Sequence, residues 1–241
     1  MASLSTAPTN VYDDVEAATV TEIQADTYLG NGASTAIANG AITAAATTIS
    51  TTDGGSTNYD STGGEIKIED ERILYTSIDT SGNYDVFSGC IRGYRGTTAA
   101  IHADTTAVTN YNVATVHQKL RDLDTKAYFH WQLPAIAVFA TGSAPDTGDT
   151  FGQWEQTINL MIEITDVSGV LSTVVERVQQ LTSELRRLMR YQLDDGSNEL
   201  NGIATDGAVW VQGSQIFISG SAKSYMVRSE TFVNVTLFTT E

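Results

Sequence analysis

The sequence predicts an α+β fold in which a mainly antiparallel sheet packs with one long helix and carries an inserted all-β module. Three observations lead to this class. An apolar stripe at helical spacing runs through residues 169–192. Segments with period-two alternation precede and follow that stripe. A block rich in Thr, Ser, Gly and Ala at 31–112 lies between two helical patterns, which predicts an insertion.

The predicted domain boundaries follow the change in composition. Residues 1–30 and 113–241 form the expected host domain, and residues 31–112 form the inserted module. A linker and a set of short strands are the two interpretations of residues 33–62, and their threonines and isoleucines in partial alternation favour strands. Residues 64–91 alternate more clearly between turn residues and predict a meander of at least three strands.

The host domain is predicted to alternate helices and strands. The expected helices cover residues 11–30, 113–131 and 169–192, and the expected strands cover 133–141, 154–167, 208–221 and 223–239. Gly30 provides a stop for the first helix. Arg186, Arg187 and Arg190 complement the negative C-terminal end of the long helix.

The charge balance limits the partners that the chain can bind. Its formal net charge is −16 and its pI is about 4.4. Nucleic acid and anionic membranes need a cationic footprint, so the composition argues against both as default partners. The N-terminus lacks the basic and apolar regions of a signal peptide, and no 18-residue apolar run predicts a membrane span.

Few residues suggest chemistry. His102, His117 and His130 have no partner at a metal-ligand spacing, which predicts no metal site. Cys90 is the only cysteine and ends a strand pattern, which favours a small buried residue over a nucleophile. No serine-hydrolase motif is present. We therefore expect neither enzymatic activity nor a cofactor.

One stretch, CIRGYRGTTAAIHADTTAV at residues 90–108, concentrates arginine, glycine and histidine. It lacks the lysine of a phosphate loop and the repetition of an RNA-binding RG segment. We interpret it as the closing part of the module. Gly93 and Gly96 are expected to supply turn geometry, and Arg92 and His102 to tie the loop back by hydrogen bonds.

Residues 41–109 resemble a small β-module that recurs in virion proteins of tailed phages. The resemblance rests on AITAAATTISTTD, GGEIKIEDERILYTSI and GNYDVFSGCIRGYRGTTAAIHADTTAV. The most specific part is Arg-Gly, a short spacer, Gly-Thr-Thr-Ala-Ala, one residue and His-Ala. The chain departs from the usual pattern at Glu69 and Thr105, where glycine is expected.

The rest of the chain resembles the tail terminator, or tail-completion, proteins of long-tailed phages. The resemblance covers residues 11–30 and 116–241 and rests on the order of elements and on LPAIAV. It implies a structural virion protein that forms a ring, most commonly a homohexamer, in the neck at the head-proximal end of the tail. Such a ring ends the tail tube and takes part in head–tail joining during virus assembly in the host cytoplasm.

The resemblance also implies partners. They are further copies of the chain, the tail tube protein and the head–tail connector proteins, while DNA passes through the ring lumen without specific binding. No membrane is involved, and no catalytic residues belong to this role. The ring order, the neighbouring proteins, the type of tail and the task of the module remain open.

Two further expectations concern surfaces. Arg177, Arg186, Arg187 and Arg190 are candidates for contacts between subunits, with a solvated helix face as the alternative. The alternative function is a baseplate or fibre-associated phage protein whose β-module binds host glycans. Its aromatic platform would be Tyr84, Phe87 and Tyr94.

Overall fold

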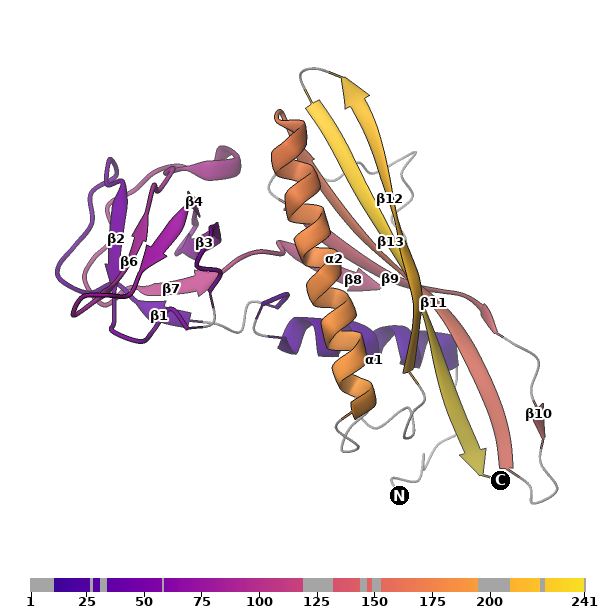
Figure 1. Cartoon of the computed structure of the whole chain (residues 1–241). Helices are drawn as coiled ribbons and strands as arrows, with labels where there is room; N and C mark the ends of the chain where they lie inside the picture. Colours follow the sequence, from indigo (N-terminus) through magenta and orange to yellow (C-terminus); the bar gives the residue numbers. More distant parts are fainter. Residues whose placement is uncertain are drawn as a thin grey trace. The chain divides into compact units, whose positions relative to one another are not determined.

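The computed structural model describes residues 11–26, 28–30, 34–57, 59–118, 132–143, 147–148, 153–194, 209–221 and 224–240. Strands account for 47% of these residues and helices for 22%. The predicted α+β class is therefore wrong, because the described chain is mainly β, with three sheets and two α-helices. It divides into a large unit (residues 1–23, 115–127 and 133–241) and a small unit (24–114 and 128–132), drawn in Figure 1.

The helix predicted over residues 113–131 accounts for part of this error. Its first described residues form strand β8, Thr115–Gln118, which pairs in parallel with the following strand. Pairing with an apolar neighbour outweighed a weak helical pattern there, because strand formation depends strongly on context. The remainder of the predicted helix, 119–131, lies outside the described residues.

The large unit is built on a sheet of six strands in the order β12-β13-β11-β9-β8, with β10 paired to β11. All of its pairings except β8–β9 are antiparallel. Its other strands are β9 (Ala135–Ser143), β10 (Thr147–Gly148), β11 (Gln153–Ser168), β12 (Val209–Ser221) and β13 (Ser224–Thr240).

Period-two alternation sets the register of the two longest strands. Ile158 and Leu160 of β11 lie opposite Val235 and Val233 of β13, and all four side chains are buried. A shift of one residue would move these apolar groups to the other face of the sheet. The alternation therefore fixes both the pairing and the core.

Helix α2, Leu171–Asp194, runs along β11, β12 and β13 (Figure 1). Its buried residues recur at helical spacing: Val174, Val178, Leu181, Leu185, Leu188 and Met189. Val174 and Val178 pack against Val227 of β13. Burial of such a stripe, rather than intrinsic propensity, provides most of the stability of a helix.

Helix α1, Val11–Ala25, is attached to the end of β9. The buried Glu16 accepts a hydrogen bond of 2.7 Å from the backbone N–H of Ala140, and Tyr12 donates one to Ser143. The helix ends earlier than residue 30, because the Asp26 carboxylate accepts hydrogen bonds from the N–H groups of Tyr28 and Leu29. Neither described helix is long and apolar enough to cross a membrane.

The small unit contains two antiparallel sheets. One has the order β1-β7-β3-β4 and the other β2-β6-β5. Its strands are β1 (Ser34–Ala36), β2 (Thr48–Thr51), β3 (Gly64–Ile68), β4 (Glu71–Tyr75), β5 (Ser77–Asp79), β6 (Asp85–Ser88) and β7 (Ala107–Asn110). Strands β1 and β2 lie within residues 33–62, so this segment contains the expected short strands and is not simply a linker.

The small unit has a core of its own. Ile37, Ile42 and Ile49 from the polar N-terminal block join Ile66, Ile68, Ile73 and Val108 in one buried cluster. Phe87 lies at its centre, with edge-to-face contacts of 5.2 Å to Tyr59 and 4.9 Å to Tyr75 between ring centroids. Such aromatic pairs stabilise a core beyond the area they bury.

Candidate functional site

The stretch at residues 90–108 closes on one buried carboxylate, that of Glu71 in β4. Arg92 binds Glu71 through two nitrogens, Nε to Oε1 at 2.8 Å and Nη2 to Oε2 at 2.7 Å. His102 Nε2 lies 2.8 Å from the same Oε2. The backbone N–H groups of Gly93 and Ala100 also donate to Glu71, at 2.9 and 3.0 Å. Five donors therefore converge on one side chain.

This arrangement favours the ionised form of Glu71. Burial alone would raise its pKa, but the hydrogen bonds from Arg92, Ala100, Gly93 and His102 outweigh burial and lower the pKa to about 2. Both carboxylate oxygens are occupied by groups of the loop itself. Glu71 is therefore a structural anchor for the loop, with no oxygen available to act on a substrate.

The guanidinium of Arg92 extends the anchor to two other segments. It donates to the carbonyl oxygen of Ala100 at 2.7 Å and to that of Thr43. His102 makes a second contact, from Nδ1 to Oε2 of Glu69 at 2.8 Å. Each ring nitrogen of His102 therefore lies within hydrogen-bond distance of one carboxylate.

A second buried ion cluster was not found from the sequence. Glu65 of β3, which is fully buried, accepts from Arg95 Nε at 3.0 Å and is paired with Arg72 of β4. The Arg72 guanidinium also lies over the ring of Tyr111, 4.9 Å from its centroid. The one available signal was that Glu65 begins the alternating run of β3.

Backbone geometry explains why glycine is expected at the two positions where this chain departs from the pattern. Glu69 and Thr105, where glycine was expected, have φ values of 52° and 67°. These values lie in the left-handed region that favours glycine. Gly93 has a φ of 61°, and a Cβ atom there would lie 2.8 Å from the carbonyl oxygen of Thr97. The small unit therefore adopts a left-handed backbone conformation, which favours glycine, at two positions where this chain has Glu69 and Thr105.

The remaining residues considered for chemistry are not assembled into a site. Burial raises the pKa of the Cys90 thiol to about 11, which disfavours the reactive thiolate. His117 lies in β8, and His130 lies outside the described residues. Within the described ranges, no group of three His, Cys, Asp or Glu side chains is arranged to hold a metal ion.

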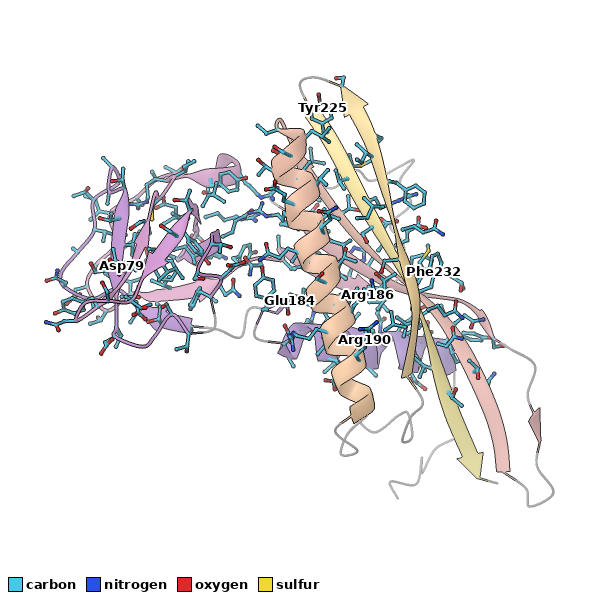
Figure 2. The ribbon with its side chains drawn as sticks, in the orientation of Figure 1. Asp79, Glu184, Arg186, Arg190, Tyr225 and Phe232 are labelled. Atoms are coloured by element: carbon cyan, nitrogen blue, oxygen red, sulfur yellow. The ribbon has the colours of Figure 1, made fainter. Side chains whose placement is uncertain are left out.

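Two of the four arginines of α2 have an acidic partner within the chain. Arg177 lies 3.6 Å from Asp166 of β11, and Arg187 lies 2.6 Å from Glu184 of its own helix. Arg177 and Arg187 therefore have acidic partners within their own chain. Arg186 and Arg190 are one turn apart, with Arg190 exposed, and neither forms an ion pair with a described residue (Figure 2).

The aromatic platform expected for glycan binding is not assembled. Phe87 is fully buried in the core of the small unit. Tyr94 is half-buried beside Arg95, and Tyr84 is 39% exposed. Phe87 cannot stack on a sugar without unfolding of the core. Its ring instead makes edge-to-face contacts with Tyr59 and Tyr75.

The face of the large sheet that carries Glu163 contains one unusual buried charge. Glu163 of β11 is directly opposite Glu230 of β13, and Arg228 lies 3.6 Å from Glu163 and 3.0 Å from Glu230. Burial raises the pKa of Glu163, although hydrogen bonding from Thr165 and the charge of Arg228 oppose this. Thr165, Arg228 and Glu163 thus interact with one another within the sheet.

A run of three exposed apolar side chains lies on β12, an edge strand of the large sheet among the described residues. Ile216, Phe217 and Ile218 are 40%, 41% and 54% exposed. Over Val209–Ser221 the strand contains no charged residue and no proline. A bulge between Val211 and Gly213 interrupts its pairing, and every residue from 215 to 221 is exposed.

Sequence comparison adds no family assignment to this geometry. No protein-family model matches the chain, and a search of curated proteins found no significant match. The candidate functional site is therefore defined by its surfaces: the open edge of β12 and the basic part of α2.

Proposed function

We propose that the chain is a structural subunit of a ring at the head-proximal end of a phage tail, and that neighbouring subunits associate along the open edge of β12. The observation that carries the proposal is the exposed run Ile216–Ile218 on an edge strand without charge or proline. The phage context comes from the sequence resemblance of residues 41–109 and of the flanking host domain.

An open sheet edge presents unpaired backbone N–H and C=O groups to any other strand. Proteins usually protect such edges with lysine, proline or a strong bulge. In β12 the bulge lies before Gly213, so the eight residues from Ser214 to Ser221 remain regular. Three consecutive exposed apolar side chains on that segment favour burial against another protein surface.

A second copy of the chain is the partner that fits this edge. Two copies that each carry a net charge of −16 repel one another over most of their surfaces. The edge of β12 is uncharged, so association there brings no like charges together. A contact between two different surfaces of identical subunits generates a closed ring when the rotation between subunits allows it.

The finer parts of the proposal follow from the resemblance. We propose a homohexamer in the virion neck that ends the tail tube and contacts the tail tube protein and the head–tail connector. The acidic balance suits a ring around a DNA path, because a negative lumen does not retain DNA.

An edge-blocking variant tests the proposal. Ile218→Lys places a charge in the regular segment of β12, whereas Ile101→Lys makes the same change at a 72% exposed residue of the small unit. We expect negative-stain images of the wild-type chain and of Ile101→Lys to show rings, and Ile218→Lys to give smaller species with unchanged circular dichroism. Rings of unchanged abundance in Ile218→Lys would reject β12 as the contact.

A further inference from the structure

Arg186 and Arg190 form a basic pair on the C-terminal half of α2 (Figure 2). They are four residues apart, so they lie on the same side of the helix, where like charges destabilise it slightly. The other two arginines of the helix have acidic partners in their own chain, Asp166 for Arg177 and Glu184 for Arg187. The pair thus offers guanidinium groups that the described residues leave available.

The surface of the small unit is acidic, in contrast to the basic pair on α2. Residues 24–114 contain four basic residues, Lys67, Arg72, Arg92 and Arg95. The three arginines are held by Glu65 and Glu71, with 6% or less of each guanidinium-bearing side chain exposed. Five exposed carboxylates remain on its surface: Asp53, Glu69, Asp70, Asp79 and Asp104. The internal ion clusters consume the positive charge of the unit and leave its surface acidic.

The turn between β3 and β4 is the densest part of this acidic surface. Glu69 and Asp70 are adjacent there, and the Glu69 side chain is 62% exposed. Its Oε2 binds His102, which holds the turn in place. Glu69 has a left-handed φ of 52°, and both carboxylates of the turn belong to exposed residues.

We propose that Arg186 and Arg190 of one copy bind the Glu69–Asp70 turn of the small unit of a neighbouring copy. The inference rests on the proposed ring and assigns the small unit a task within it, that of bracing adjacent subunits. Charge complementarity selects the partner, because each copy carries both an available arginine pair and an acidic turn. Arginine binds carboxylates with a defined two-point geometry, so the contact also fixes orientation.

Nucleic acid is a weaker partner for the same arginines. Two guanidinium groups provide a small cationic footprint, and the chain around them has a net charge of −16. The two partners nevertheless predict different results. A contact between copies depends on Asp70, whereas binding of DNA does not.

Charge exchange tests the contact. We would measure the self-association of the wild-type chain, of Arg186→Glu/Arg190→Glu, of Asp70→Lys and of the combined variant by sedimentation at low and high salt. Each separate change is expected to weaken association about tenfold, and the combined variant to recover most of the loss, because opposite charges again meet. Asp79→Lys, an exposed carboxylate elsewhere on the small unit, is the matched control and should have no effect.

The outcomes separate this contact from the ring itself. A wild-type chain that stays monomeric at high concentration rejects the proposed function and this contact together. Wild-type rings that all the charge variants form equally well reject the contact alone, as does a combined variant with additive losses. Loss of binding to a short DNA duplex in Arg186→Glu/Arg190→Glu, with rings intact, would assign the arginines to nucleic acid instead.

Discussion

Nε2 of His102 lies 2.8 Å from Oε2 of Glu71, the same oxygen that accepts from Arg92 Nη2 and from the N–H of Ala100. This contact joins the two halves of a loop whose sequence concentrates arginine, glycine and histidine. Arg92 and His102 hold the loop against β4 through Glu71, and Arg95 binds Glu65 of β3. The loop therefore stabilises the small unit.

Arg92→Ala should destabilise the small unit by about 3 kcal/mol, since it leaves the buried Glu71 without its main charged partner. Hydrogen exchange measured by mass spectrometry can locate the effect. We expect faster exchange in peptides of β3, β4 and β7 and no change in α2 or β11. Arg187→Ala removes an exposed ion pair and should cost less than about 1 kcal/mol. Equal acceleration in both units would contradict the assignment.

Glu71 should make the small unit sensitive to acid. Its pKa is about 2 in the folded chain and 4.5 for the free side chain, so folding favours the ionised form. The stabilisation, about 3 kcal/mol, is complete above about pH 4.5 and is lost as the pH falls toward 2. Acid unfolding followed by tyrosine fluorescence should be less steep in Glu71→Gln, which starts from a lower stability at neutral pH. Parallel curves for the two proteins would count against Glu71.

Glu163 should have the opposite pH dependence. Burial raises its pKa, so the folded state favours the protonated form and carries a penalty once the pH exceeds that pKa. Glu163→Gln keeps an acceptor for Thr165 and should raise the thermal midpoint at neutral pH. The gain should shrink as the pH falls from the raised pKa toward 4.5, and it should be absent below 4.5, where Glu163 is protonated in both the folded and the unfolded chain. A variant less stable than wild type at neutral pH would show that the charge is needed by Arg228.

Thr105→Gly should stabilise the small unit by about 1 kcal/mol. A β-branched residue at a φ of 67° is strained, and glycine relieves this at a smaller cost in unfolded-state entropy. Asn39→Gly is the matched control, because asparagine tolerates its φ of 68° and the change should have little effect. Chemical denaturation measures both variants. Destabilisation by Thr105→Gly would mean that the threonine hydroxyl, which donates to the carbonyl oxygen of Asp104, matters more than strain.

Local sequence patterns predicted several helices and strands well, but they did not predict which elements pair with one another. Helix α2 and strands β11 and β13 could be predicted from the apolar stripe over 169–192 and from the alternation, because each pattern repeats over many residues. The strand at Thr115–Gln118 was taken for a helix, since its pairing with β9 depends on residues distant in sequence. The abundance of strands overall made the expected fold class wrong.

The candidate surfaces were predictable only in part. Arg92 and His102 were expected to bind back onto the module, but their common partner Glu71 could not be identified without the register of β3 and β4. The pairs Arg177–Asp166 and Arg187–Glu184 depend on side-chain geometry that spacing does not specify. The position of β12 at a sheet edge could not be predicted, because it depends on how all the described strands are ordered in the sheet.

The most direct test of the central claim is the mass of the intact wild-type assembly, measured by native mass spectrometry. A single closed species, most simply a hexamer of the 25.8 kDa chain, is the predicted result. Its abundance should fall in Ile218→Lys and remain in Ile101→Lys. A wild-type chain that is monomeric at every concentration tested would contradict the proposal that it forms a ring.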